Sequence, residues 1–403
     1  MKKYHIFLFL SISISLIIIF NCKSNSPTEQ NNEDPPPNTS DVSGTWTTDN
    51  SPYQVNEKLI IPDGETLIIN PGVEIIFNGH YQFEVNGRLL AVGTEQDSIK
   101  FIASNKNAGW HGIRLLNVSS TNDSTIFEYC IFKNGKANTG SGADRSGGAI
   151  IANTGKLRIS HCLFQNNIQS APSRPDGGGG AIAITGGQPI IEYCEFNANE
   201  STYGAAILNV NNSTNPIIRN NHFHNNYGHG IINSVENASP ILINNLIESN
   251  LADEHGIVHI GSGSGSVILI NNTIVNNTCE GGSAIFVNDS SPPLCINNII
   301  YGNESSQIDY SVSSAYYFFN CLIEEFNAVY PGNYENCIDS NPLFVGSDNF
   351  HLQENSPCIG AGVESLEINS VIYSAPSVDI EGDQRPNPVN TTPDIGAYEY
   401  GVN

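Results

Sequence analysis

The stretch Ile218-Arg219-Asn220-Asn221-His222-Phe223-His224-Asn225-Asn226 contains one copy of a pattern that decides the fold. The pattern reads apolar residue, two variable residues, Asn or Cys, one variable residue, apolar residue. Its eight copies are Phe127–Phe132, Ile159–Phe164, Ile191–Phe196, Ile218–Phe223, Leu242–Ile247, Leu269–Ile274, Cys295–Ile300 and Phe318–Ile323. Successive copies are 32, 32, 27, 24, 27, 26 and 23 residues apart. A period in this range indicates a stacked repeat architecture.

A second element, Gly followed by small and β-branched residues, precedes most copies. It occurs at Gly148-Ala149-Ile150, Gly180-Ala181-Ile182, Gly204-Ala205-Ala206-Ile207, Gly230-Ile231-Ile232, Gly256-Ile257-Val258 and Gly282-Ser283-Ala284-Ile285. One rung therefore reads as a Gly-Ala-Ile strand, a turn, a strand carrying the Asn or Cys, and a loop of variable length. Short β-rich runs bounded by Gly, Pro, Asn and Asp extend this pattern back to residue 58.

A rung of this length is too short to fold alone, so its strands must pair with those of neighbouring rungs. Stacking predicts parallel sheets around a continuous apolar core. The fourth position of the pattern should then form an inward file in which Asn side chains bond to each other. That file comprises Cys130, Cys162, Cys194, Asn221, Asn245, Asn272, Asn298 and Cys321. Parallel side chains fit disulfide geometry poorly, so we expect the first three cysteines to be buried thiols.

The chain is strongly acidic, with 40 Asp and Glu against 16 Lys and Arg and a formal charge of -24. Nucleic acid is therefore excluded as a partner, because phosphate binding needs a basic surface. No Lys or Arg occurs between Arg219 and Arg385, so this half should repel polyanions unless cations bridge them. The simpler alternative is that the acidity keeps an extracellular monomer soluble.

The amino terminus indicates export. Lys2 and Lys3 precede the apolar run Ile6–Phe20, which is typical of a signal peptide. The following Asn21-Cys22 resembles the lipobox of bacterial lipoproteins, although Asn21 departs from the usual small residue. The resemblance implies lipidation of Cys22 and a membrane-anchored protein at the cell surface. Residues 1–21 are then the signal peptide, and the Pro-rich, polar residues 22–43 are a disordered tether.

The repeats resemble those of right-handed parallel β-helix proteins related to pectate lyases. The resemblance covers roughly residues 58–326 and implies an all-β solenoid of about ten rungs, which we assign to residues 44–326. Residues 327–403 resemble the choice-of-anchor Q module, through motifs such as Asn341-Pro342-Leu343-Phe344, Ser356-Pro357-Cys358-Ile359-Gly360 and Asp394-Ile395-Gly396-Ala397-Tyr398. Gly360 stands where that family commonly has Asp. The resemblance implies a carboxy-terminal capping module but no reaction.

The variable loops carry most of the reactive side chains. Asp144 and Asp176 each follow the Cys of their repeat by 14 residues, so they should stack. Such a pair could bind calcium, the one cofactor that the sequence suggests, or act as acid and base. Arg145 or Arg174 could then be the base, the role that Arg has in the pectate lyases that the fold resembles. The alternative is that these loops are polar because they are solvated.

A second group of candidates follows on the same side. We predict a ligand-binding set made of Tyr203, His224, Tyr227, His229, Asp253 and His255. The Tyr residues, with Tyr301, could stack on sugar rings, and the His residues could bind a metal. Their spacing matches no tight metal motif, and ordinary surface residues are the alternative.

Arg385, the only cation after Arg219, is surrounded in the sequence by Asp379, Asp383, Asp394 and Glu399. We expect it to hold the carboxy-terminal module together through charge-assisted hydrogen bonds.

Three functions remain open at this stage. The first is a lipid-anchored, non-catalytic module that binds or displays extracellular glycans, and the absence of a catalytic motif favours it. The second is a polysaccharide lyase or glycoside hydrolase that acts from the loop face. The third is a structural adhesin. Fold alone cannot choose among them, because function depends on the site.

Overall fold

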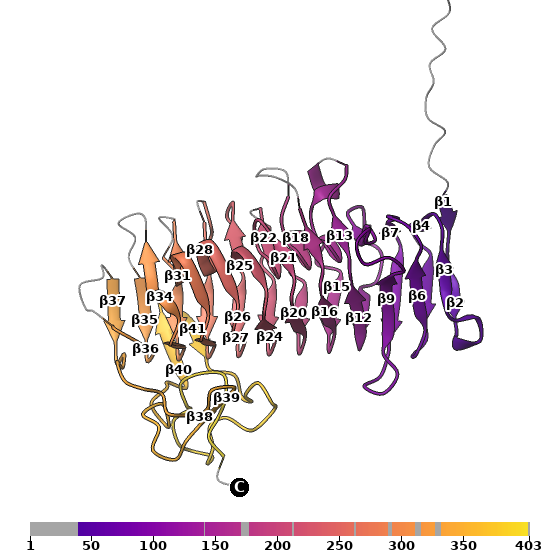
Figure 1. Cartoon of the computed structure of the whole chain (residues 1–403). Helices are drawn as coiled ribbons and strands as arrows, with labels where there is room; N and C mark the ends of the chain where they lie inside the picture. Colours follow the sequence, from indigo (N-terminus) through magenta and orange to yellow (C-terminus); the bar gives the residue numbers. More distant parts are fainter. Residues whose placement is uncertain are drawn as a thin grey trace, which may run out of the picture. The chain divides into compact units, whose positions relative to one another are not determined.

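Each repeat folds into one coil of three short strands, and successive coils stack strand upon strand (Figure 1). The structure is a computed structural model that describes residues 39–140, 142–170, 177–211, 213–261, 263–288, 292–310, 316–326 and 332–401. All of these residues belong to one unit, Asn38–Asn403. Of the helices in these ranges, none combines the length and apolar composition that a membrane crossing needs.

The described strands of the coils form three parallel sheets, here named A, B and C, of 14, 12 and 11 strands. The main strands of sheet A are β1 (Thr39–Asp41), β4 (Lys58–Ile61), β7 (Phe83–Val85), β10 (Ile113–Leu115), β14 (Ile150–Asn153), β18 (Ile182–Gly186), β22 (Ile207–Val210), β25 (Tyr227–Val235), β28 (Leu251–Ile260), β31 (Thr278–Val287) and β34 (Glu304–Tyr310). Three two-residue strands extend it, β13 (Lys136–Ala137), β17 (Ile168–Gln169) and β21 (Glu200–Ser201).

Sheet B contains β2 (Gly44–Trp46), β5 (Thr66–Ile69), β8 (Arg88–Val92), β11 (Thr125–Glu128), β15 (Leu157–Ser160), β19 (Ile190–Glu192), β23 (Ile217–Arg219), β26 (Ile241–Ile243), β29 (Ile268–Ile270), β32 (Leu294–Ile296), β35 (Tyr316–Phe319) and β37 (Gly332–Glu335). Sheet C contains β3 (Tyr53–Val55), β6 (Glu74–Phe77), β9 (Ile99–Ala103), β12 (Cys130–Lys133), β16 (Leu163–Gln165), β20 (Glu195–Asn197), β24 (His222–His224), β27 (Leu246–Glu248), β30 (Thr273–Val275), β33 (Ile299–Tyr301) and β36 (Leu322–Ile323). Among the residues that the structure describes there are two short 3₁₀ turns, Thr48–Asn50 and Gly142–Arg145.

The register confirms the predicted repeat. In sheet C, Phe164 pairs with Phe196, Phe196 with Phe223, and Phe223 with Ile247, so each strand pairs with its copy one period later. The same holds for the Gly-Ala-Ile strands of sheet A, where Ile150 pairs with Ile182. The inward Phe rings stack with centroids 4.6 to 5.0 Å apart from Phe101 to Phe223. A continuous apolar core results.

The inward file of Asn and Cys is confirmed. The Nδ2 atoms of Asn221, Asn245 and Asn272 donate to the Oδ1 atom of the next Asn at 3.0, 2.9 and 2.9 Å. Cys130, Cys162 and Cys194 are free thiols at the same position, and burial raises the pKa of the Cys162 and Cys194 thiols well above its usual value. The file satisfies buried amides by repetition.

A second buried file, which was not predicted, lies five residues after six of the members of the first file. Its members bond in sequence with Nδ2 to Oδ1 distances between 2.8 and 3.0 Å, and they are Asn167, Asn199, Asn226, Asn250, Asn277 and Asn303. In the stretch Ile218–Asn226, Asn221 therefore belongs to the first file and Asn226 to the second.

The residue before each member of the first file forms the corner between sheets B and C. These corner residues have φ between 48° and 56°, and they are Tyr129, His161, Tyr193, Asn220, Asn244, Asn271, Asn297 and Asn320. Asn accepts this left-handed backbone more readily than most residues, which explains why it is common here.

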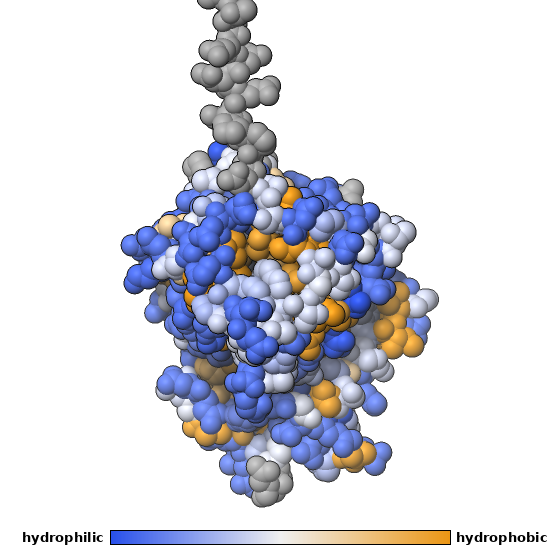
Figure 2. Space-filling view, turned by 90° about the vertical axis from the view of Figure 1, so that its right-hand side faces the viewer, coloured by the Kyte–Doolittle hydropathy of each residue, from blue (hydrophilic) through white to orange (hydrophobic). Residues whose placement is uncertain are grey.

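The first coil begins within the segment predicted to be tether, because Thr39–Asp41 pairs in parallel with β4. Trp46 and Tyr53 stack in this coil with ring centroids 4.4 Å apart and are partly buried against the core. Figure 2 looks at this end of the stack and shows apolar residues in the middle of the face, surrounded by hydrophilic ones. At the other end the stack of coils also continues past its predicted limit of residue 326, because β37 pairs with β35.

The carboxy-terminal module is mostly irregular and contains two hairpins, β38 (Phe344–Gly346) with β39 (Asn349–Leu352) and β40 (Ser365–Ile368) with β41 (Val371–Ser374). It packs beside the last coils rather than in line with them (Figure 1). Phe350, Leu352 and Ile395 form a buried cluster with apolar residues from the outer face of sheet C. The corner between sheets B and C is therefore covered in these coils.

The corner Asn residues fasten the module to the coils. Four of them donate their side-chain amides to backbone carbonyls of the module. Asn244 bonds to Val378, Asn271 to both Asp394 and Gly396, Asn297 to Val363, and Asn320 to Ala361. Arg385 is buried within the module, as expected, and donates to Glu399 at 2.8 Å. Its Nη1 atom also donates to Oδ1 of Asn244 at 2.7 Å, so it joins the module to the helix as well.

Candidate functional sites

The predicted loops of the later coils are strands. The segments that carry His229 and Asp253 belong to β25 and β28, which are 9 and 10 residues long. The connection between the two repeat elements is so short there that the backbone stays extended and pairs with the neighbouring coil, with an irregular register between Gly228 and Gly230. The side chains therefore lie on rigid strands, which fixes their relative positions.

Five of the six predicted ligand-binding residues meet near the start of β25 and β28. We call these five the acidic-aromatic site, and they are Tyr203, Tyr227, His229, Asp253 and His255. The ring centroid of His229 is 5.4 Å from that of Tyr203 and 5.8 Å from that of His255. Tyr203 comes from the turn between β21 and β22, one coil earlier.

Carboxylates surround these rings. The hydroxyl of Tyr227 donates to Oδ2 of Asp253 at 3.2 Å, and the other oxygen of Asp253 is 3.7 Å from Nε2 of His229. Nδ1 of His229 is 3.3 Å from an oxygen of Glu254. A hollow of about 260 Å³ opens beside this cluster and is lined by Glu200, Tyr227, His229 and Asp253 among others.

The electrostatics of the acidic-aromatic site disfavour Tyr227 as a general base. The negative charge of Asp253 and its hydrogen bond raise the pKa of Tyr227 above its usual value. Tyr227 therefore stays protonated and is a poor general base. Its ring is 43% exposed, which leaves a face available to a ligand.

The predicted catalytic set is only partly visible. Arg174 and Asp176 lie outside the described residues, so the calcium pair stays a prediction. Asp144 and Arg145 lie in the turn Gly142–Arg145, where Asp144 accepts a hydrogen bond from Nε2 of Gln82 at 3.1 Å. Arg145 donates from Nε to the carbonyl of Gly140 at 2.8 Å. These contacts hold the turn against the earlier coils. Cys22, the predicted lipidation site, is also outside the described residues.

His111 contacts the turn Gly142–Arg145 and is held as a neutral imidazole. Its Nε2 lies 2.8 Å from the carbonyl oxygen of Asp144, and its Nδ1 lies 3.4 Å from the amide of Gln82. Burial and the nearby Arg114 lower its pKa to about 4. We interpret His111 as a support for the Asp144 turn, since both of its ring nitrogens have partners.

The sixth predicted ligand residue, His224, does not join the acidic-aromatic site. It lies on β24, which belongs to sheet C, and its side chain faces outward because the intervening Phe223 faces the core. His222, two residues earlier, faces the same way, and the two rings stack with centroids 4.3 Å apart. The prediction grouped His224 with His229 by closeness in sequence, but a corner of the coil separates them.

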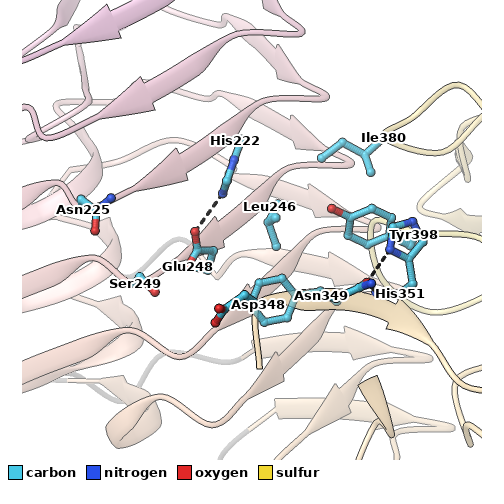
Figure 3. A pocket seen from close by; sticks show the side chains of 11 residues that line it. His222, Asn225, Leu246, Glu248, Ser249, Asp348, Asn349, His351, Ile380 and Tyr398 are labelled. Carbon is cyan, nitrogen blue, oxygen red and sulfur yellow. Dashed lines mark hydrogen bonds and ion pairs between the residues drawn. The ribbon is translucent and has the colours of Figure 1, made fainter. Parts of the chain in front are cut away.

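A larger hollow lies between this part of sheet C and the carboxy-terminal module. It measures about 470 Å³ and is drawn in Figure 3. His222, Leu246 and Glu248 line it from the coils, while Asp348, Phe350, His351, Ile380 and Tyr398 line it from the module. Two His–Glu pairs flank it, His222 with Glu248 at 2.9 Å and His351 with Glu381 at 3.0 Å.

The carboxylates of sheet C near this hollow are ionised. A hydrogen bond from His224 is the main reason that the pKa of Glu195 is lowered. Burial opposes ionisation of Glu248, but hydrogen bonds from His222 and Ser249 outweigh it, and its pKa is lowered as well. Sequence reasoning missed this site because half of its lining comes from a module whose docking position no local pattern encodes. The His-x-His spacing on one strand was the only available signal.

Coils of three parallel strands stacked in this way define the class of protein, a right-handed parallel β-helix. A family model described as "Right handed beta helix region" matches residues 90–266 and 147–323, which together span more than half of the chain. The chain belongs to this family. No curated protein matches the sequence. Among solved structures, it is similar to the crystal structure of pectate lyase Pel9A, with a TM-score of 0.44 and 13% identity over 91% of this chain and 86% of that one. This likeness carries no inference about activity.

Proposed function

We propose that the protein is a non-catalytic glycan-binding module that uses the acidic-aromatic site. One observation supports this most directly: Tyr227 and His229 line a hollow together with the carboxylates of Glu200 and Asp253, and the ring of Tyr203 packs against His229. Aromatic faces suit the apolar faces of sugar rings, and carboxylates accept hydrogen bonds from sugar hydroxyls. Strands of neighbouring coils hold these groups in place before a ligand arrives, which lowers the entropy cost of binding.

The charge favours neutral glycans. Asp253, Glu254 and Glu200 lie at or near the hollow, and no Lys or Arg occurs between Arg219 and Arg385. A uronate polymer would bring further negative charge to this surface at a Coulombic cost. A polysaccharide lyase acts on such uronates, so this charge speaks against a lyase at the acidic-aromatic site.

The proposal can be tested with a panel of soluble polysaccharides. Affinity electrophoresis would compare neutral polymers such as xyloglucan, glucomannan and dextran with polygalacturonate and alginate, while released reducing and unsaturated ends are assayed in the same samples. We expect retention by at least one neutral polymer without release of ends. Release of unsaturated ends would establish the lyase instead, and no retention by any polymer would favour a structural adhesin.

Matched variants locate the binding. Tyr227→Ala and Asp253→Asn should each weaken retention by at least about tenfold, or about 1.4 kcal/mol. Tyr193→Ala is the control, because Tyr193 is 37% exposed, close to the 43% of Tyr227, but lies at the corner between sheets B and C. Equal losses in the Tyr193 and Tyr227 variants would place the binding elsewhere.

We also propose that the protein is exported and anchored through a lipid on Cys22. The apolar run Ile6–Phe20 and the following Asn21-Cys22 support this. Cells expressing the chain would be labelled with radioactive palmitate. We expect label in the wild-type protein and none in Cys22→Ala, whereas equal labelling of both would contradict the assignment.

A further inference from the structure

The outer face of sheet C carries a group of imidazoles and carboxylates that glycan binding does not use. His222 and His224 alternate with the inward Phe223 on β24, so both face outward. On β20, Glu195 pairs with His222, and on β27, Glu248 pairs with His224. Adjacent strands lie about 4.8 Å apart, so the four side chains occupy one small area.

The contacts within this group are close. Nε2 of His222 is 2.9 Å from Oε1 of Glu248, and Nε2 of His224 is 2.9 Å from Oε1 of Glu195. One ligand atom each from His222, His224 and Glu248 lies within 4.8 Å of the other two. Ligand atoms of a tetrahedral zinc ion are about 3.4 Å apart, given metal–ligand distances near 2.1 Å. Small side-chain rotations therefore suffice to enclose an ion.

The backbone that carries these ligands is held from both sides. Asn221 immediately precedes β24 and belongs to the first buried file, while Asn226 follows it and belongs to the second. A metal site on such a strand needs little reorganisation of the protein, which favours binding.

The donor types select the metal. Two imidazole nitrogens and one carboxylate suit zinc and its first-row neighbours. Calcium requires six to eight oxygen ligands, which this group does not offer. Glu195 contacts His224, an arrangement in which a carboxylate orients a ligating imidazole.

We propose that His222, His224 and Glu248 bind a zinc-class divalent cation, and that Glu195 is the carboxylate that positions His224. His222 and Glu248 also line the hollow of about 470 Å³ between sheet C and the carboxy-terminal module (Figure 3), so an ion bound to them would be open to water or to an oxygen atom of a small ligand in that hollow. The opposing explanation is two His–Glu pairs that stabilise the surface without an ion.

Metal titration separates the two explanations. A second candidate group, His229, Glu254 and His255, would confuse the stoichiometry, so all measurements use untagged full-length protein with His229→Ala. After treatment with a chelator, this protein should bind one equivalent of Zn²⁺ by isothermal titration calorimetry. Co²⁺ in place of Zn²⁺ should give the intense visible absorption bands of a four- or five-coordinate ion. Absence of binding would overturn the proposal.

Variants in the same background test the residues. His222→Ala, His224→Ala and the nearly isosteric Glu248→Gln should each weaken Zn²⁺ binding at least about tenfold, and Glu195→Gln should weaken it by a smaller factor. His161→Ala is the control, since His161 lies at an exposed corner outside the group, and it should leave affinity unchanged within twofold. Thermal unfolding without metal verifies that each variant folds. One equivalent bound equally well by His222→Ala and Glu248→Gln would overturn the assignment.

Discussion

The corner between sheets B and C has the same left-handed backbone along the stack, but its residues differ between two regions. In the middle coils Tyr129, His161 and Tyr193 occupy it, and their rings stack with centroids 4.7 and 5.0 Å apart. From Asn220 onward the corner residues are Asn, and the amides of Asn244, Asn271, Asn297 and Asn320 bond to the carboxy-terminal module. The same turn therefore accepts either kind of residue, and the Asn side chains gain hydrogen-bond partners where the module covers the corner.

The largest expected effect comes from removing the cation that joins the carboxy-terminal module to the later coils. Arg385→Met should destabilise the docked module by about 3–5 kcal/mol, because it leaves Glu399 buried without its partner. Hydrogen exchange of residues 344–400 would measure the loss, with the coils unchanged. The double variant Arg385→Met with Glu399→Leu should recover part of it. Unchanged exchange in Arg385→Met would show that the module docks without this contact.

A smaller loss should follow when one covered corner loses its amide. Asn271→Gly keeps a residue that accepts the positive φ but removes hydrogen bonds to the carbonyls of Asp394 and Gly396, at an expected cost of about 1–3 kcal/mol. Asn166→Gly is the control, since Asn166 has φ 55° at an exposed position. It should change stability by less than about 0.5 kcal/mol. Equal losses in denaturant titration would mean that the amide bonds to the module contribute little.

The inward file should respond alike in both regions. Asn245→Cys should cost about 1 kcal/mol, because Cys321 already occupies this position and accepts from the backbone of Asn298 at 3.4 Å. Asn245→Leu should cost more, since it removes the acceptor of both the backbone N–H and one side-chain N–H of Asn221. Denaturant titration of the two variants would compare them. A Cys variant less stable than the Leu variant would contradict the idea that the file accepts either polar residue.

The smallest effect is expected at the open corner. His161→Asn exchanges the residue type of the middle coils for that of the later coils, with the same backbone preference. His161 is exposed at this corner, so its replacement should change thermal stability by less than about 0.5 kcal/mol. A loss above about 1 kcal/mol would show that the stack of Tyr129, His161 and Tyr193 stabilises these coils itself.

The fold was predictable because it repeats. The period placed Asn221 and Asn245 in one file and Phe196 against Phe223, and the register agrees at each point. What repetition does not specify was missed. The docking of the module depends on contacts such as Arg385 with Asn244, 141 residues apart, which occur once and leave no periodic signal.

The candidate sites, too, were predictable only where their residues repeat from coil to coil. The meeting of Tyr203, His229 and His255 could be predicted, because each lies at a similar place in successive coils. The assignment of His224 to that group was wrong, because its side chain faces outward from sheet C, whereas the group lies on sheet A. Only one short turn of the chain separates the two sheets at this point. The hollow beside His222 required the position of Tyr398, which sequence spacing does not give.

The row of corner Asn residues also fixes how the stack could grow. Before residue 220, a whole coil could be duplicated or deleted, because the buried Asn and Cys files and the parallel sheets require only that each coil resemble the next. Between Asn244 and Asn320, each coil is matched to its own place on the module. Loss of one coil there would shift the remaining contacts by about 4.8 Å. The module thus fixes the number of coils that lie beside it. Variation in the number of coils is expected only in the part of the stack that the module does not contact.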